Sequence, residues 1–280
     1  MKCFVCGGEM QPYFTKKIAV KYLRDLDTFE YVRCEHCGLV VSKTLYEMSH
    51  EDWSEFNYNS HKDLYFNGVL KFEEIDPKYS TRHDAQANMF VELVQNGVFK
   101  YDWRTIDYGA CDGALANQIN GKLEKVWLKK FDAYIEPLDE NYLTQEEVTP
   151  KTFDFLLSTS VFEHLFGNKG EVDNIINLIK PDGIMGLHTL ICEEVPQDPE
   201  WFYLLAVPVH CTLWTNKSMS IVFQKNNFKH CAYNVEAQMW LFFRNEEAWQ
   251  KLNEVKEKLS GTWILKDDFI DYWKVKPYRK

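Results

Sequence analysis

Four cysteines near the N-terminus form two closely spaced pairs. They are Cys3 and Cys6, followed after 27 intervening residues by Cys34 and Cys37, and each pair continues directly into a glycine. Two cysteines three positions apart, in a turn relaxed by glycine, can place both sulfurs on one tetrahedral ion. Four thiolates leave no open coordination position, so we expect a structural zinc site. Redox-active or disulfide-bonded pairs are the alternative interpretation of this spacing.

A second segment, residues 107–113, has the composition of a nucleotide-binding turn. It lies between a predicted strand at 105–107 and a helix that we expect to begin near Ala114. Glycines in such a turn let the backbone approach a ligand where side chains would collide. An acidic residue at the end of the next strand can bind both ribose hydroxyls. Glu136, which lies 23 residues past Gly113, is near the usual spacing of about 20 residues.

Two histidines and a glutamate follow segments that we expect to be strands. Glu163 and His164 come after the apolar segment 153–158, and His210 follows the strand predicted at 184–190. Because the carboxyl ends of parallel strands meet at one edge of a sheet, these side chains can converge there. His210 is then a candidate general base, oriented by the other two. The alternatives are that Glu163 caps a loop, His164 packs on the sheet and His210 is hydrogen-bonded within its loop. We find no second set of residues with metal-ligand spacing.

The elements that must position these residues alternate between strands and helices. Helical spacing of apolar residues predicts one helix over 85–94, ended by Gly97, and another over 172–179. This alternation predicts a mostly parallel sheet with helices on both faces. Strands are expected at 18–22 and 29–32 between the cysteine pairs, and then at 105–107, 133–135, 153–158 and 184–190.

Taken together, these segments resemble class I S-adenosylmethionine (SAM)-dependent methyltransferases. The turn 107–113 resembles their motif I, and Glu136-Pro137 resembles their acidic motif after the second strand. Segments 153–165 and 178–184 resemble their fourth-strand signature and the turn before the fifth strand, so the resemblance covers about residues 104–190. It implies an α/β, Rossmann-like class I methyltransferase sheet that follows a small N-terminal four-cysteine zinc ribbon. The cofactor-binding residues that it implies are Asp107, Gly109, Ala110, Cys111, Gly113, Glu136 and Ser158.

Two further features favour the methyltransferases that act on sugars. Cys111-Asp112-Gly113 is similar to the Asn-Asp-Gly of zinc-bearing sugar C-methyltransferases, and segment 201–214, which holds His210, resembles the substrate side of sugar and glycan methyltransferases. The family also implies a third strand, yet only 14 residues separate Pro137 from Thr152, so this strand must be shortened or lost. The resemblance implies methyl transfer (EC 2.1.1 class) to a small hydroxylated acceptor, such as a nucleotide-linked sugar or a glycan, in carbohydrate biosynthesis. An RNA base methyltransferase with a zinc module and a non-catalytic SAM-fold binding module are the alternatives.

Composition narrows the class of protein further. The chain has 280 residues, of which 45% are hydrophobic, and a formal net charge of −10. An acidic surface repels phosphate backbones and so disfavours a nucleic-acid partner. No apolar run approaches the roughly 20 residues of a membrane helix, and the N-terminus lacks the apolar stretch of a signal peptide, so we expect a cytoplasmic protein. The expected divisions are a zinc-binding module (1–50), a connector (51–80), a SAM-binding domain (81–245) and a C-terminal helix and tail (246–280).

Overall fold

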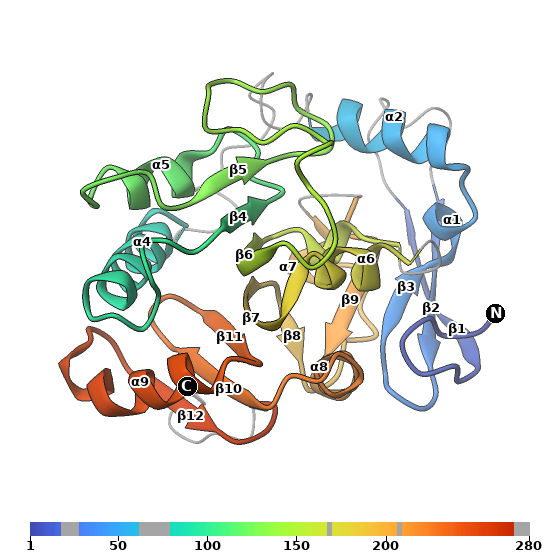
Figure 1. Cartoon of the computed structure of the whole chain (residues 1–280). Coiled ribbons are helices and arrows are strands. Elements are labelled where there is room, and N and C mark those ends of the chain that lie inside the picture. The colour runs from blue at the N-terminus through green and yellow to red at the C-terminus, as the bar shows by residue number, and fades with distance from the viewer. Residues whose placement is uncertain (18–27, 62–78, 167–169, 206–208, 272–280) are drawn as a thin grey trace.

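A seven-stranded sheet forms the centre of the protein. The computed structural model describes residues 1–17, 28–61, 79–166, 170–205 and 209–271 of the chain (Figure 1). The strand order is β12-β10-β11-β7-β6-β4-β5. The four strands β5, β4, β6 and β7 are parallel, and β11, β10 and β12 add antiparallel neighbours beyond β7. The strands are β4 (Thr105–Tyr108), β5 (Lys129–Phe131), β6 (Phe153–Thr159), β7 (Ile179–His188), β10 (His230–Asn234), β11 (Met239–Phe243) and β12 (Trp263–Lys266).

Helices cover both faces of this sheet (Figure 1). On β6, Phe155 and Leu157 pack with one set of helices and Leu156 packs with the other, because successive side chains of a strand point to opposite faces. The α/β, Rossmann-like sheet with helices on both faces, expected from the sequence, is therefore confirmed. One face carries α4 (Tyr79–Gln95), α5 (Ala114–Asn120) and α9 (Glu246–Val255), and the other carries α6 (Glu171–Asn177) and α8 (Asn216–Lys225).

The second strand of the sheet lies earlier than the sequence pattern indicated. Residues 133–135 were predicted as a strand, but the strand is Lys129–Phe131 and the later residues form a bend. Two consecutive lysines hid this strand from a search for apolar residues. Lys130 is fully buried, because its ammonium group donates hydrogen bonds to the side chains of Asn117 and Asp139 while its aliphatic stem lies in the interior.

The expected shortening of the third strand is confirmed. After β5, the chain returns alongside the sheet and makes a single parallel bridge, between Lys130 and Tyr142. The main-chain N–H of Lys130 donates to the carbonyl of Asn141, and the N–H of Leu143 donates to the carbonyl of Lys130. These two hydrogen bonds are the remnant of a strand at this edge.

The fifth strand is longer than predicted. β7 begins at Ile179 instead of residue 184 and is irregular over the Pro-Asp-Gly turn.

The N-terminal residues form a second sheet together with a distant part of the chain. Its strands β1 (Met10–Lys17), β2 (Thr28–Cys34) and β3 (Val40–Ser42) form an antiparallel meander. The sheet then continues through β9 (Thr212–Thr215) to β8 (Ile191–Cys192). The strand predicted at 29–32 lies within β2 and is confirmed, while the one predicted at 18–22 lies outside the described residues.

The segment expected to be an irregular connector is partly helical. A short helix, α1 (Lys43–Tyr46), is followed by α2 (His50–His61), and residues 62–78 lie outside the described part. Trp53 on α2 is buried, and its ring packs edge-on against Phe166 at a centroid distance of 4.4 Å. This packing explains why a mostly polar sequence is helical here. None of the described helices is long and apolar enough to span a bilayer.

Candidate functional site

The four N-terminal cysteines converge on one point. The sulfurs of Cys3 and Cys37 are 3.6 Å apart, those of Cys6 and Cys34 are 3.4 Å apart, and all four lie within 4.8 Å of one another. Zinc–sulfur bonds of about 2.3 Å would place tetrahedral ligands about 3.8 Å apart. A disulfide requires about 2.05 Å, and all four thiols are free. The geometry is that of a site able to hold one metal ion.

Each cysteine pair is built on the same turn. The N–H of Gly7 donates to the carbonyl of Cys3 at 2.8 Å, and the N–H of Gly38 donates to the carbonyl of Cys34 at 3.0 Å. The two glycines have φ of +73° and +76°, a left-handed conformation in which a side chain is strained. The glycine after each pair in the sequence is therefore what lets both sulfurs turn towards the same point.

The cysteine cluster is anchored to the part of the chain around β9. The hydroxyl of Thr215 donates to the carbonyl of Cys37 at 2.6 Å, and Phe4 packs edge-on against Trp214. Both anchoring residues lie at the end of β9, which begins two residues after His210. The cysteine cluster thus supports the strand that follows this histidine.

The turn between β4 and α5 has the close packing that its glycines predict. A Cβ on Gly109 would lie 2.4 Å from Cγ2 of Val161, and one on Gly113 would lie 2.4 Å from Cδ of Lys130, while both glycines have positive φ. Any other residue would therefore clash there. Asp107 is the next-to-last residue of β4, and Gly109, Ala110, Cys111 and Gly113 follow in the turn that leads to α5.

The acidic residue directly after the second strand is Asp132, and not Glu136. Asp132 follows β5, and its two carboxylate oxygens accept hydrogen bonds from the N–H groups of Cys111 at 3.0 Å and of Tyr134 at 2.9 Å. Glu136 is exposed, farther along the loop. Glu136 was expected at the strand end because the strand was predicted at 133–135 and lies earlier in the structure. A strand predicted at Lys129–Phe131 would have made Asp132 the acidic residue at the strand end.

Two buried polar atoms at the carboxyl edge of the sheet have no hydrogen-bond partner within the described residues. They are Oδ1 of Asp107 and Oγ of Ser158, each in the next-to-last residue of its strand, β4 and β6. A buried polar atom without a partner costs about 1–3 kcal/mol, so such atoms indicate a place where a ligand or water completes the bonding. Both residues are among those that the sequence predicts at the cofactor, and their donor and acceptor groups fit one that carries hydroxyl and amino groups.

Burial and charge also affect how Asp107 ionises. Loss of solvent, and then the nearby negative charge of Asp132, raise the pKa of Asp107 to about 7. In the unfolded chain the pKa of this carboxyl group is 3.8, so the folded chain binds the proton more tightly. Protonation at acidic pH therefore stabilises the folded chain. That stability is complete below about pH 4 and is lost as the pH rises through about 7.

This carboxyl group provides a test by pH. We expect Asp107→Asn, which cannot ionise, to raise the free energy of unfolding at about pH 8 by about 1–4 kcal/mol and to change it little below about pH 4. Urea unfolding of both proteins across this range measures the difference. A difference that is the same at acidic and alkaline pH would contradict the assigned pKa.

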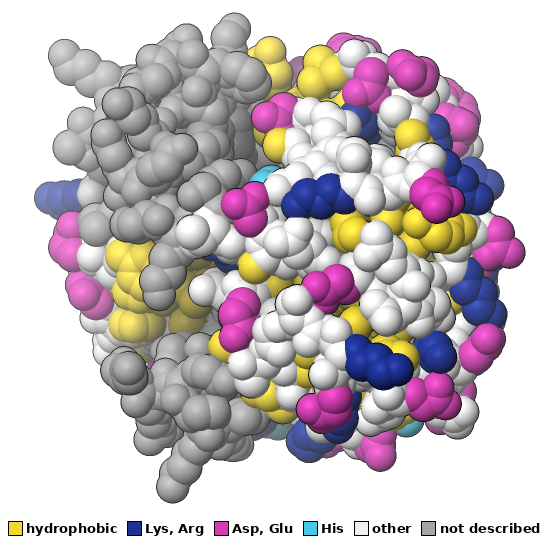
Figure 2. All heavy atoms as spheres, turned by 90° about the vertical axis from the view of Figure 1, so that its left-hand side faces the viewer, with side chains coloured by type: hydrophobic (Ala, Val, Ile, Leu, Met, Phe, Trp, Pro, Cys, Tyr) yellow, Lys and Arg dark blue, Asp and Glu magenta, His cyan; other side chains and the backbone are white. Residues whose placement is uncertain are grey.

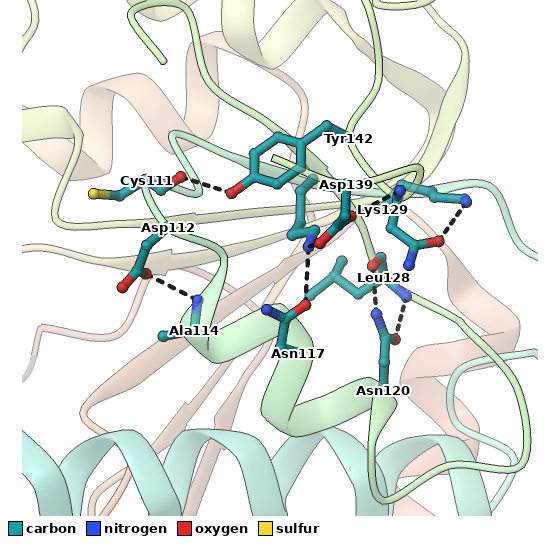
Figure 3. A network of polar contacts seen from close by, with 11 residues as sticks. Cys111, Asp112, Ala114, Asn117, Asn120, Leu128, Lys129, Asp139 and Tyr142 are labelled. Carbon is teal, nitrogen blue, oxygen red and sulfur yellow. Dashed lines mark hydrogen bonds and ion pairs between the residues drawn. The ribbon is translucent and has the colours of Figure 1, made fainter. Parts of the chain in front are cut away.

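The edge where a third strand is missing is closed by a polar network. The hydroxyl of Tyr142 donates to the carbonyl of Cys111 at 2.7 Å (Figure 3). The ammonium of Lys130 lies 4.5 Å from the centre of the Tyr142 ring. The same ammonium donates to Asn117 on α5 at 2.9 Å and to Asp139 in the returning loop. The returning chain therefore holds the turn between β4 and α5, although it adds only one bridge to the sheet.

The three residues predicted to act in catalysis lie together. One ligand-type atom from each of Glu163, His164 and His210 lies within 4.8 Å of the others, and Glu163 is 2% exposed. The carboxylate of Glu163 accepts hydrogen bonds from the hydroxyls of Tyr203 at 2.9 Å and Thr189 at 2.8 Å. Glu163 and His164 belong to a short 3-10 helix, η2 (Phe162–His164), which follows β6 and Val161, the residue packed against Gly109. The predicted convergence at the carboxyl edge is therefore confirmed.

Backbone carbonyls orient both imidazole rings. Nδ1 of His210 lies 2.8 Å from the carbonyl oxygen of Tyr203, and Nδ1 of His164 lies 3.2 Å from that of Val209. A carbonyl only accepts, so each Nδ1 carries the proton and each Nε2 has a lone pair. Burial lowers the pKa of His210 below its usual value of 6.5, partly offset by the charge of Glu163. His210 is therefore neutral at pH 7. Nothing in the sequence pointed to the hydroxyls of Thr189 and Tyr203 as partners of Glu163, although Tyr203 lies in segment 201–214.

The face of the protein that carries α4, α5 and α9 shows no broad basic area among the residues that Figure 2 colours. Lysine and arginine side chains there are interspersed with aspartate and glutamate, in agreement with the net charge of −10. Mixed charges of this kind do not attract a phosphate backbone.

Comparisons by sequence with known proteins give no match. No model of a protein family matches the chain, and no curated protein does. The family that the motifs resemble is therefore not established by sequence similarity.

Comparisons with solved structures return proteins described as methyltransferases. A phosphoethanolamine N-methyltransferase of Haemonchus contortus, in complex with S-adenosylhomocysteine, has a TM-score of 0.48 and 14% identity over 89% of this chain and 60% of its own. The CurJ carbon methyltransferase has a TM-score of 0.45 and 12% identity over 72% of this chain and 66% of its own. The plantazolicin methyltransferase BpumL has a TM-score of 0.41 and 11% identity, covering 70% of this chain and 98% of its own. Likenesses at this level define neither activity nor acceptor.

Proposed function

We propose that this protein transfers a methyl group from SAM to a small-molecule acceptor. The observation that carries the proposal is the meeting of two sets of groups at the carboxyl edge of one sheet. The buried, unpartnered Oδ1 of Asp107 and Oγ of Ser158 lie near the ends of β4 and β6, and the cluster of Glu163 and two histidines follows β6. Ligands of open α/β sheets bind at this edge.

In this proposal, Asp132 binds the ribose hydroxyls of SAM, and Asp107 and Ser158 bind its polar groups nearby. The glycine turn 109–113 lets the backbone approach the ligand. The lone pairs of Asp132 that do not accept from Cys111 and Tyr134 can accept from the two hydroxyls. Glu136, which the sequence placed in this role, is replaced by Asp132.

Proton removal from the acceptor is assigned to His210. SAM supplies an electrophilic methyl group, so the protein has to align the acceptor and accept its proton. Nε2 of His210 has the lone pair for this, since its Nδ1–H is held by the carbonyl of Tyr203. Glu163 stabilises the imidazolium that results, and His164 helps to hold the acceptor in line.

We further propose that the acceptor is hydroxylated, as a nucleotide-linked sugar or a glycan is. Three consecutive aromatic residues, Trp201, Phe202 and Tyr203, lie beside the catalytic cluster, and Tyr203 bonds directly to Glu163. Phe202 is 59% exposed. An exposed aromatic ring beside polar side chains suits a sugar, which has both an apolar face and hydroxyl groups.

The N-terminal cysteines are proposed to bind one structural zinc ion. Their four sulfurs surround one point and the two identical turns orient them, so zinc binding can supply folding energy to this small segment. Thiolate ligands of this kind persist in a reducing compartment, so we place the protein in the cytoplasm.

The cofactor assignment is tested by comparing two acidic residues of the same loop. We expect Asp132→Asn to weaken SAM binding about 10-fold or more, because charge-assisted hydrogen bonds contribute about 1.5–3 kcal/mol. Glu136→Ala, the matched control, should leave SAM affinity unchanged. Calorimetric titration with SAM gives both affinities, and thermal unfolding reports whether Asp132→Asn remains folded.

Other results would redirect the proposal. Equal affinity in both variants would remove the ribose role from Asp132. Wild-type protein that binds no SAM would favour a non-catalytic module with this fold. SAM-dependent methylation of RNA, with a steep salt dependence, would replace the small-molecule acceptor by a nucleic acid.

A further inference from the structure

The catalytic cluster has the donor set of a divalent metal site. Two imidazoles and a carboxylate, from Glu163, His164 and His210, are drawn from two segments of the chain and lie within 4.8 Å of one another. Metal–ligand distances of about 2.0–2.2 Å place ligand atoms about 3–4 Å apart, so small side-chain movements suffice to close on an ion. Neutral imidazole with carboxylate suits zinc and its neighbours in the first transition row better than magnesium or calcium.

The hydrogen bonds behind these three side chains resemble those behind metal ligands. A ligating histidine almost always donates its other ring N–H to a carbonyl, carboxylate or water, which fixes the tautomer and the ring orientation. Both histidines do so: the Nδ1–H groups of His164 and His210 face the carbonyls of Val209 and Tyr203. Each ring therefore has its lone pair on Nε2, the nitrogen with which it can bind a metal ion.

The carboxylate is held in the same way, and its charge needs compensation. Glu163 is 2% exposed, and the two donors that bond it, the hydroxyls of Tyr203 and Thr189, are neutral. A buried carboxylate without a cation carries a desolvation penalty of several kcal/mol. A divalent ion between this carboxylate and the two imidazoles would offset that penalty.

We propose that Glu163, His164 and His210 bind one divalent transition-metal ion, of which zinc is the best match, in addition to the ion at the cysteines. Three protein ligands leave a coordination position open, unlike the closed four-cysteine site. The ion uses the Nε2 lone pair of His210, which the base in the proposed function also needs. An ion bound here therefore inhibits methyl transfer by occupying the base. This last step rests on the proposed function, in which His210 is the base.

Cobalt titration of the full-length protein tests the site. We expect Co²⁺ to bind protein whose cysteine site is already filled with zinc, at one ion per chain, with weak visible bands and without the strong thiolate-to-metal bands of a cysteine site. Glu163→Gln, which keeps side-chain size, and His210→Asn, which keeps a donor in place of Nδ1, should each weaken this binding at least about 100-fold. Tyr203→Phe removes only a hydrogen bond to a ligand and should weaken it about 10-fold, the smaller of the losses usual for such changes. His50→Ala, which removes an exposed histidine on α2, is the matched control and should bind Co²⁺ normally.

Three results would overturn the proposal. One is a wild-type protein that takes up no ion beyond the cysteine site. Another is ion binding that Glu163→Gln and His210→Asn leave unchanged while circular dichroism shows both variants folded. The third is stimulation of methyl transfer by the ion, which would contradict the proposed inhibition. A wild-type protein that binds the ion but not SAM would refute the proposed function and leave the metal site supported.

Discussion

Replacing His210 with alanine should reduce methyl transfer by about 10² to 10⁴, the usual contribution of a positioned base. SAM affinity should stay close to that of the wild type, because His210 lies in the cluster after β6 and not in the turn between β4 and α5. Single-turnover measurement of methyl transfer, together with calorimetry for SAM, separates the two effects.

A second variant distinguishes loss of the base from loss of structure. His210→Asn keeps a donor that can reach the carbonyl of Tyr203 but has no group in place of Nε2. It should therefore be as inactive as His210→Ala, and His50→Ala should be fully active. The rate of the wild type should rise with pH below about 6.5, since burial lowers the pKa of His210, and both variants should lose that rise. Wild-type turnover in His210→Asn would show that His210 is structural.

Cys34→Ser should release one metal ion per chain and destabilise the N-terminal sheet. Zinc binding by short cysteine modules is worth about 10–16 kcal/mol in apparent free energy, so this segment should not keep its fold without the ion. Because β3 pairs with β9 and Thr215 bonds to Cys37, the loss should spread beyond the first 50 residues to β9. Hydrogen exchange should show lost protection in β2 and β9 and retained protection in β6.

Metal analysis provides the control for this prediction. Cys111→Ser removes an exposed thiol outside the cluster and should keep the full metal content. A wild-type protein that contains no metal, with four free thiols and a fully protected N-terminal sheet, would contradict the zinc site. Loss of metal from Cys34→Ser with normal protection in β9 would show that the two parts of the chain fold independently.

Local patterns in the sequence were enough to predict most of the elements and of the residues that carry chemistry. Strands at 105–107 and 153–158, a helix from Ala114 and the two glycine turns after the cysteine pairs follow from short-range spacing, and the structure contains them. Such features depend on neighbouring residues: apolar alternation, conformational freedom at glycine and repeated cysteine spacing. For the same reason the cluster of four cysteines could be predicted before any fold was known.

Only the tertiary structure decided features that depend on burial. Two consecutive lysines, Lys129 and Lys130, predict an exposed segment, yet they belong to β5. Lys130 can be buried there because its ammonium group donates hydrogen bonds to Asn117 and Asp139. Because the strand was predicted four residues too late, Glu136 was expected to bind the ribose. The strand ends next to Asp132 instead.

The sequence by itself determined which residues could do chemistry, and the tertiary structure decided how they are combined. The pairing of β3 with β9 joins the cysteine cluster to the segment that holds His210, although the two lie far apart in the chain. No local pattern records the hydroxyl of Tyr203 on Glu163 or the carbonyls that orient the two histidines. Contacts between distant segments depend on how sheets pack and pair, and their free energy is gained only when the whole chain has folded.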